Sequence, residues 1–336
     1  MQRLQHIETW LKTLNPAHTF QLAPASADAS FRRYFRASFS DGKTLIVMDA
    51  PPEHEDCRPF IHVAALLAEA GVNAPKVLAQ DLERGFLLLT DLGGTTYLSV
   101  LDQDNATLLY RDACKALVKI QLTSKKDVLP DYNAALLTRE MQLFPDWYIG
   151  KYLDVTLSPA QQAVLQGTFA TLNANILAQG QVFVHRDYHS RNLMLCDQEN
   201  QGQNPGILDF QDAVHGSISY DLVSLLKDAY IYWEEEQILD WAIRYWEDAR
   251  KASLPVPADF ADFYRDFEWM GAQRHIKVLG IFARLYYRDS KDGYLKDMPL
   301  VMKYLRKTCE RYNELRPLLR LLDELEPKET TTGMSF

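Results

Sequence analysis

Residues 182–213 read VFVHRDYHSRNLMLCDQENQGQNPGILDFQDA and contain the most informative chemistry of this 336-residue chain. Asp187 and Asn192 stand close together in this stretch, and Asp209 follows after a polar segment and a short apolar run. Phosphoryl transfer from a nucleotide needs a carboxylate that orients the attacking hydroxyl and accepts its proton, together with two oxygen ligands for Mg²⁺. One Asp, one Asn and a second Asp are spaced to supply these groups.

Two short apolar runs anchor the polar segment at both ends. Residues 182–184 and 193–196 are β-type runs that favour burial in a core. Residues 198–206 are rich in Asn, Gln and Gly, which predicts a hairpin connection. A loop, a hairpin and a second loop would bring the two aspartates and the asparagine to one side.

The segments HRDYHSRN and ILDFQDA resemble the catalytic and metal-binding loops of the aminoglycoside phosphotransferase and choline kinase family. The resemblance implies that Asp187 is the catalytic base and that Asn192 and Asp209 hold Mg²⁺. The first pattern also arises by chance in loops, but the second motif at the expected distance favours the family. The implied fold class is α+β, a two-lobed protein-kinase-like fold. Its small N-lobe has an antiparallel sheet and one main helix, and its larger C-lobe is mostly helical.

Composition excludes several other classes of protein. A hydrophobic content of 47% is ample for a core, and a net charge of −9 attracts neither nucleic acid nor an anionic membrane. The four cysteines form no Cys-x-x-Cys pair, which favours reduced thiols in a cytoplasmic protein. No apolar stretch has the length needed to span a bilayer. The oligomeric state is left open.

The first third of the chain carries the signals of a kinase N-lobe. They predict a helix over 1–15, a turn at Asp41-Gly42, a strand over 44–50, a helix over 59–70 ended by Gly71, and strands over 77–79 and 86–90. The last strand leads into Asp91-Leu92-Gly93-Gly94, where a kinase has its adenine-binding hinge. The resemblance therefore implies that Thr90, Asp91 and Leu92 contact the base. We expect an N-terminal nucleotide-binding lobe over 1–93, a catalytic and substrate-binding lobe over 94–325, and a disordered tail over 326–336.

Residues 26–30 are small and polar and lead into the alternating run SFRRYFR, which predicts a tight turn that enters a strand. In the kinase-like fold the turn between the first two strands covers the ATP phosphates. Ser30, Phe31 and Arg33 are therefore candidate nucleotide-binding residues. A solvated basic strand is an alternative explanation for the arginines, since neighbouring strand residues point to opposite faces.

The lysine with which this family usually contacts the nucleotide phosphates is missing. Met48 and Asp49 stand where it is expected. Either another cation such as Arg33 takes its place, or the site is catalytically dead. A pseudokinase that binds nucleotide and acts by docking to a partner is thus one alternative. A protein without catalytic activity would, however, have no reason to retain Asp187, Asn192 and Asp209.

The remaining two thirds of the sequence has helical periodicity, with helices expected over 105–123 and 158–179. Between them, the aromatic segment 143–148 makes Trp147 a candidate for stacking on a sugar ring, with core packing as the alternative. Asp221 stands at the head of a later helix. We expect it to cap that helix and to brace the backbone of the catalytic loop.

A basic stripe is expected on the helix that contains residues 273–288. At about 100° per residue, Arg274, Lys277, Arg284 and Arg288 fall within roughly 80° of one another. Facing a pocket, the stripe would repel a polycationic aminoglycoside and could hold a carboxylated amino sugar through bidentate arginine contacts. Facing water, it would need no ligand. Arg274, Arg284 and Arg288 are the candidate substrate-binding residues.

Four further segments resemble one subgroup of this family. SFRRYFR, IVMDAPP, LLLTDLGG and QRHIKVLGIFARLYYRD look like those of the sugar 1-kinases of cell-wall recycling, in which the strand lysine is also absent. This likeness implies an ATP- and Mg²⁺-dependent kinase that phosphorylates the anomeric hydroxyl of N-acetylmuramate and N-acetylglucosamine. Its partner would be a small amino sugar. An aminoglycoside, choline or homoserine phosphotransferase is the alternative within the same family.

Overall fold

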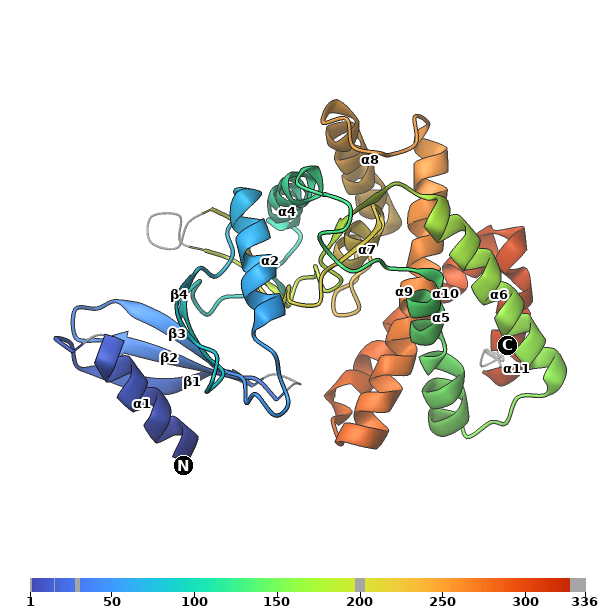
Figure 1. Ribbon diagram of the computed structural model, residues 1–336. Helices are drawn as coiled ribbons and strands as arrows, with labels where there is room; N and C mark the ends of the chain where they lie inside the picture. The colour runs from blue at the N-terminus through green and yellow to red at the C-terminus, as the bar shows by residue number, and fades with distance from the viewer. Residues whose placement is uncertain (1, 15, 28–30, 197–202, 327–336) are drawn as a thin grey trace, which may run out of the picture. The chain divides into compact units, whose positions relative to one another are not determined.

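The computed structural model describes residues 2–14, 16–27, 31–196 and 203–326. The chain divides into two compact units (Figure 1). Unit 1 comprises residues 1–123 and 190–213, and unit 2 comprises residues 124–189 and 214–336. This division differs from the boundary expected near Gly94, because the next two helices and the 190–213 segment belong to the unit that contains the sheet. Of the expected tail, only Glu326 lies among the described residues.

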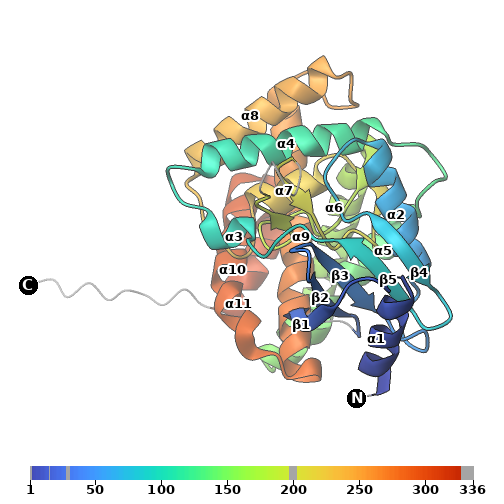
Figure 2. The same cartoon turned by 90° about the vertical axis from the view of Figure 1, so that its left-hand side faces the viewer.

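Unit 1 is built on a five-stranded antiparallel sheet with the order β1-β2-β3-β5-β4 (Figures 1 and 2). The strands are β1 (Phe20–Ala27), β2 (Arg33–Phe39), β3 (Thr44–Asp49), β4 (Val77–Asp81) and β5 (Phe86–Thr90). Four of them match the sequence prediction, whereas β1 was not predicted. Gly42, with φ of 86°, makes the turn between β2 and β3 as expected.

Two helices accompany the sheet. Helix α1 (Gln2–Leu14) packs Ile7, Trp10 and Leu11 into one core cluster with apolar residues of β2, β3 and β5. Helix α2 (Arg58–Glu69) is followed by Gly71 with φ of 66°, so the predicted glycine at its C-terminal end is confirmed. The sheet and its helices confirm the small antiparallel lobe expected from the sequence.

A short hairpin completes unit 1, together with helices α3 (Tyr97–Val100) and α4 (Ala106–Leu122). Its strands are β7 (Leu193–Met194) and β8 (Gly206–Ile207), so the predicted hairpin is confirmed for the described residues. A Cβ atom on Gly206 would lie 2.7 Å from Sγ of Cys196 and 3.0 Å from Cδ1 of Leu92. Glycine therefore lets the hairpin pack closely against the segment that follows β5.

Unit 2 is mostly helical. Its helices are α5 (Ala134–Met141), the π-helix η1 (Phe144–Tyr152), α6 (Pro159–Ala178), α7 (Tyr220–Leu226), α8 (Glu235–Lys251), α9 (Phe260–Asp289), η2 (Asp292–Asp297), α10 (Met298–Arg311), η3 (Asn313–Leu315) and α11 (Arg316–Leu325). The long helix α9, orange in Figure 1, packs against α5, α6, α7, α8, α10 and η1. A Cβ atom on Gly280 would lie 2.4 Å from the carbonyl carbon of Leu143, so glycine is required where α9 meets the start of η1.

A two-stranded ribbon in unit 2 leads into the loop that contains Asp187. Strand β6 (Gln181–Val184) pairs antiparallel with β9 (Val214–Ser217). All four cysteines are buried free thiols, which agrees with the expected absence of disulfides. None of the described helices combines the length and apolar character needed to cross a membrane. The antiparallel sheet and the mostly helical remainder confirm the α+β class.

Candidate active site

The loop that contains Asp187 begins directly after the buried end of β6. The backbone N–H groups of His185 and Arg186 donate hydrogen bonds of 2.7 Å and 3.0 Å to the two carboxylate oxygens of Asp221. Arg186 has φ of 78°, a conformation that is sparsely populated by residues other than glycine. The carboxylate of Asp221 therefore holds the loop in a conformation that it would not adopt unaided.

The predicted bracing role of Asp221 is confirmed, but its predicted capping role is wrong. The N-cap position of α7 is Ser219, and Asp221 lies in the first turn of the helix. Its two oxygens accept hydrogen bonds from the loop backbone. The carboxylate of Asp221 therefore binds the loop backbone and does not cap its own helix.

Arg274 of α9 holds the same loop from its carbonyl side. Its Nη1 atom donates hydrogen bonds of 3.0 Å to the backbone oxygen of Arg186 and 3.1 Å to the hydroxyl of Tyr220. Arg274 is only 7% exposed, so its guanidinium group is committed to positioning the loop. A contact between Arg274 and substrate, expected from the sequence, stays a prediction.

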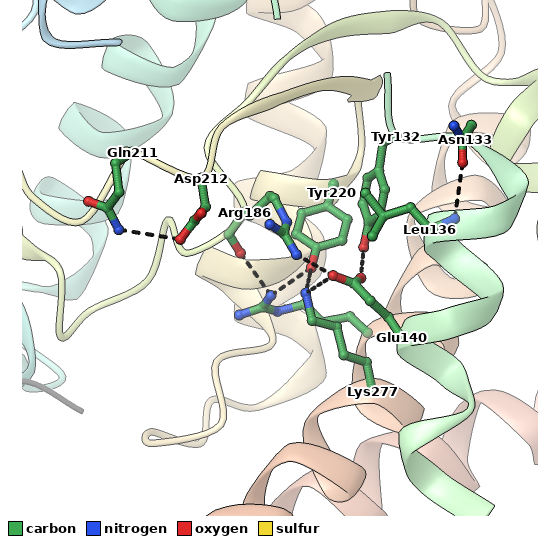
Figure 3. A network of polar contacts seen from close by, with 10 residues as sticks. Tyr132, Asn133, Leu136, Glu140, Arg186, Gln211, Asp212, Tyr220 and Lys277 are labelled. Atoms are coloured by element: carbon green, nitrogen blue, oxygen red, sulfur yellow. Dashed lines mark hydrogen bonds and ion pairs between the residues drawn. The ribbon is translucent and has the colours of Figure 1, made fainter. Parts of the chain in front are cut away.

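A buried polar network surrounds this loop (Figure 3). Glu140 of α5 accepts hydrogen bonds from Arg186 and Tyr132, and its carboxylate lies 3.2 Å from Nζ of Lys277. The same Nζ donates to the hydroxyl of Tyr220 at 3.0 Å. Burial opposes ionisation of Glu140, but the charges of Lys277 and Arg186 outweigh it and hold its pKa below the usual value. The ionised carboxylate of Glu140 thus pairs with both Arg186 and Lys277.

Asp187 and Asp221 have opposite pKa shifts. Burial would raise the pKa of Asp187, but the positive charges of Lys277 and Arg274 more than offset it and lower that pKa. Asp221 lacks comparable compensation, and burial raises its pKa to about 7. Two carboxylates in different surroundings can hold different protonation states at one pH. Asp187 is therefore ionised at neutral pH, as a proton acceptor must be.

The hairpin of unit 1 brings Asn192 and Asp209 together. The backbone N–H of Leu208 donates to the carbonyl oxygen of Asn192 at 2.9 Å, which continues the pairing of β7 and β8. Nδ2 of Asn192 then lies 3.2 Å from Oδ2 of Asp209, and Nε2 of Gln211 lies 2.8 Å from Oδ1. Asp209 has φ of 63°, a left-handed conformation that Asp tolerates better than most residues.

This pair fits the expected Mg²⁺ ligands. The described residues contain no cluster of three His, Cys, Asp or Glu side chains that would hold a transition metal. Mg²⁺ instead takes one or two protein oxygens and completes its shell with water and substrate phosphate. The side-chain amides of Asn192 and Gln211 donate to the two oxygens of Asp209, so a cation that bound this carboxylate would compete with them. When bound there, Mg²⁺ would neutralise charge on the nucleotide phosphates.

Asp187 belongs to unit 2, whereas Asn192 and Asp209 belong to unit 1. The three roles therefore stay predictions for the individual residues, supported by the bracing of Asp187 and by the pairing of Asn192 with Asp209.

A cavity of about 340 Å³ lies within unit 1, a size typical of small-molecule sites. Thr90, Asp91 and Leu92, the expected hinge residues, all line it. Its other polar lining comes from Tyr34, Arg36, Thr96, Arg191, Asn192 and Asp209. Apolar side chains, such as those of Ile46 and Phe60, supply much of the remainder. The expected base-binding and metal-binding segments thus share one cavity.

Tyr34 and Arg191 were not among the site residues expected from the sequence, and Arg33 was favoured over Arg36. The pairing of β2 with β3 identifies the strand residues that line the cavity. Arg36 pairs with Ile46, and alternation along β2 places Tyr34 on the same face as Arg36. That face lines the cavity. This face can be recognised only when the register between β2 and β3 is known, and the sequence alone does not determine that register.

The candidate residues ahead of β2 have different surroundings. Ser30 lies outside the described residues. Phe31 is 63% exposed, and its ring stacks on His54 with centroids 4.4 Å apart. Arg33 is bonded to the carboxylate of Asp49 and is absent from the cavity lining. Nucleotide contacts by these residues stay predictions.

The missing strand lysine has a structural explanation. Asp49 is fully buried, and it pairs with Arg33 and, at 2.9 Å through Nε, with Arg3 of α1. Met48 is 1% exposed and packs in the core. Both positions at the end of β3 therefore serve folding, and the charge that a lysine would bring must come from elsewhere.

The predicted substrate residues of unit 2 do not behave as one group. Trp147 of η1 is partly buried, and Phe144 and Tyr148, which precede and follow it in the sequence, are buried. Nε of Arg284 is buried and makes no hydrogen bond with any described residue. Arg288 is exposed and pairs with Asp289 at 2.8 Å and 2.9 Å.

The expected basic stripe needs correction. Arg274 and Lys277 are 7% and 6% exposed, and both are bonded to buried neighbours in the network around Tyr220. This half of the stripe is therefore buried and does not face solvent or an open cleft. Glu140 and Tyr220 are its buried partners. Helical periodicity showed which residues share a face, but not what covers that face.

The chain matches the model of the phosphotransferase enzyme family over residues 21–260. The chain belongs to this phosphotransferase family. A curated relative from Neisseria meningitidis serogroup B, named N-acetylmuramate/N-acetylglucosamine kinase, is 50% identical to it over 341 residues, with 100% of both chains covered.

Solved structures resemble the phosphotransferase in fold. Choline kinase from Streptococcus pneumoniae has a TM-score of 0.64 and 13% identity, covering 91% of this chain and 100% of that one. An ADP-bound aminoglycoside phosphotransferase has a TM-score of 0.55 and 13% identity, covering 90% of this chain and 98% of that one. At such identities the likeness shows the fold alone. The family and the fold that the sequence motifs indicated are confirmed.

Proposed function

We propose that this phosphotransferase transfers the γ-phosphoryl group of ATP, with Mg²⁺, to the anomeric hydroxyl of N-acetylmuramate and N-acetylglucosamine. The observation that carries the proposal is the 50% identity to a kinase named for these sugars across the full length of both chains. Such a kinase would act in peptidoglycan recycling. The cytoplasmic location is part of the proposal, and four free thiols fit a reducing compartment.

The roles of individual residues follow from their surroundings. Asp187, ionised and held on a braced loop, orients the sugar hydroxyl and accepts its proton. Asn192 and Asp209 hold Mg²⁺, and the segment from Thr90 to Leu92 contacts the adenine base in the cavity. Phosphoryl transfer relies chiefly on positioning and on charge stabilisation, so a rigid loop with fixed charges suits it.

The preference for N-acetylated sugars over an aminoglycoside or choline is supported by the relative named for these sugars. The buried cations near Asp187 do not decide it, because Glu140 pairs with Lys277 and Arg186, and Arg274 is bonded to the loop backbone. Intact Asp187, Asn192 and Asp209 count against a pseudokinase.

A direct test is to incubate the protein with ATP, Mg²⁺ and a panel of acceptors, and to identify the phosphorylated oxygen by ³¹P NMR. The panel contains N-acetylmuramate, N-acetylglucosamine, kanamycin, choline and homoserine. We expect anomeric phosphates of the two amino sugars and no product from the cationic acceptors. Robust phosphorylation of kanamycin or choline, or of a hydroxyl other than the anomeric one, would refute the proposal.

A further inference from the structure

An arginine–aspartate pair lines the cavity of unit 1 beside the expected hinge. Nε of Arg36 donates to Oδ2 of Asp91 at 2.6 Å, and Nη2 donates to Oδ1 at 3.1 Å. Nη2 also donates to the carbonyl oxygen of Gly93 at 2.8 Å. The guanidinium group of Arg36 is therefore fixed in a bidentate pair on the segment that would contact the base.

This pair is locally neutral. Its carboxylate is 5% exposed, and its guanidinium side chain is 31% exposed. Burial opposes ionisation of Asp91, but hydrogen bonds from Arg36 and from the backbone of Gly93 outweigh it and lower the pKa. A cation that is already compensated by a bonded carboxylate adds little attraction for phosphate. Arg36 is therefore a poor substitute for the phosphate-binding lysine.

The remaining features of Arg36 suit a flat, polarisable ligand. A guanidinium group is planar, and it stacks on aromatic rings. Nη1 makes no hydrogen bond with any described residue, so one donor of the fork stays available to a ligand acceptor. Fixing the group on Asp91 and Gly93 in advance lowers the entropy lost on binding.

We propose that Arg36 recognises the nucleobase of the bound nucleotide through its planar face and its Nη1 donor. This proposal rests on the nucleotide binding that the proposed function requires. It assigns to Arg36 a part of the site that is distinct from the phosphates. Arg191, which lines the same cavity next to the metal-ligand candidate Asn192, is the residue whose placement suits the phosphates.

The test compares affinities for three probes: adenosine, Mg²⁺ with ATP, and Mg²⁺ with tripolyphosphate. Arg36→Ala would leave the buried Asp91 without its partner and could unfold unit 1. Arg36→Lys keeps the charge pair and removes the planar group, so it is the informative variant. Arg191→Ala is the contrasting variant, and Arg111→Ala, exposed on α4, is the matched control. Titration calorimetry on the full chain gives the dissociation constants, and thermal melting confirms folding.

We expect Arg36→Lys to weaken adenosine and ATP binding by the same factor, about ten-fold, and to leave tripolyphosphate binding unchanged. Arg191→Ala should weaken ATP and tripolyphosphate but not adenosine, and Arg111→Ala should change nothing. If Arg36→Lys weakens ATP and tripolyphosphate while adenosine is unaffected, or weakens none of the three, the proposal is overturned. Adenosine affinity too low to measure in a wild-type protein that binds ATP would overturn it as well.

Failure of the underlying function has a different signature. A wild-type protein that binds neither ATP nor tripolyphosphate contradicts nucleotide binding itself, and with it both proposals. A wild-type protein that binds ATP and phosphorylates sugars, but whose Arg36→Lys variant behaves like the Arg111→Ala control, contradicts only the role of Arg36.

Discussion

Nδ2 of Asn192 lies 3.2 Å from Oδ2 of Asp209, although 17 positions separate the two residues in the sequence. The β7–β8 hairpin brings their backbones together, and the left-handed conformation of Asp209 accompanies the contact. A hard cation prefers oxygen ligands, so its binding here would require Oδ1 of Asn192 to turn toward Asp209 in place of Nδ2.

Replacing Asp209 by Asn should therefore weaken the binding of Mg²⁺ with nucleotide. Loss of the charged ligand removes the main electrostatic attraction at the site, while the amide preserves the shape of the side chain. We expect the Mg²⁺ concentration that gives half-maximal activity to rise at least ten-fold, with partial recovery of turnover at high Mg²⁺. Titration of activity with Mg²⁺ at saturating ATP measures this. An unchanged Mg²⁺ dependence would exclude Asp209 as a ligand.

Replacing Asp187 by Asn should affect turnover instead. The amide cannot accept the proton of the acceptor hydroxyl, and general-base catalysis contributes about 10²- to 10⁴-fold. We expect kcat to fall by a factor in this range, with little change in nucleotide affinity, because the loss falls on the transition state. Asp131→Asn, which alters an exposed carboxylate of the same unit, is the matched control. Turnover that equals wild type in Asp187→Asn would remove the assignment.

The raised pKa of Asp221 predicts a specific pH dependence of stability. Its folded-state pKa of about 7 lies above the ordinary value of 3.8, so the folded protein binds this proton more tightly than the unfolded chain does. The contribution of Asp221 to stability is therefore fully present below pH 3.8 and is lost as pH rises through about 7. Between these values it lowers the free energy of unfolding by up to about 1.4 kcal/mol per pH unit.

Urea unfolding of wild type and Asp221→Asn at pH 5, 6, 7 and 8 isolates this slope, because the other titrating groups are common to both proteins. We expect the wild-type slope to be more negative between pH 5 and 7, and the two slopes to converge at pH 8. Asp187 does not interfere, since its lowered pKa places its own effect at more acidic pH. Parallel pH profiles would show that Asp221 stays ionised throughout.

The structure singles out Arg284 within the basic stripe. Its Nε is buried without a hydrogen-bond partner among the described residues, whereas Arg288 already pairs with Asp289. If Arg284 holds the carboxylate of N-acetylmuramate, Arg284→Ala should raise KM for that sugar by about 10- to 100-fold and affect N-acetylglucosamine little. Arg288→Ala is the matched control, with a smaller effect. Equal losses for both sugars in Arg284→Ala would contradict a carboxylate-binding role.

Sequence patterns predicted most of the fold because local signals agreed with tertiary packing. The Asp41-Gly42 turn and the helix ended by Gly71 need a positive φ that glycine adopts easily, and the hairpin needs a glycine at position 206 because a Cβ atom would not fit there. β1 was missed, because its sequence FQLAPASA contains a proline and small residues that are unfavourable in strands.

The site was predicted less completely, for a different reason. Asp187, Asn192 and Asp209 carry a recognisable spacing, but the surroundings that determine their chemistry come from distant parts of the chain. Glu140 of α5 was not singled out, since nothing local distinguishes a buried carboxylate from a solvated one. Arg33 was favoured over Arg36 because the sequence does not reveal which arginine meets Asp49 and which meets Asp91.

Helix α1 has a practical consequence for anyone who wishes to shorten this protein. The family match begins at residue 21, after α1 has ended, so a truncation guided by that match would delete the helix. Ile7 and Leu11 are fully buried against the sheet, and Arg3 is one of two arginines on the buried Asp49. Without α1 an apolar sheet face would be uncovered, and exposed apolar surface of this kind promotes aggregation. Yield of soluble material, rather than catalysis, would be the first property lost.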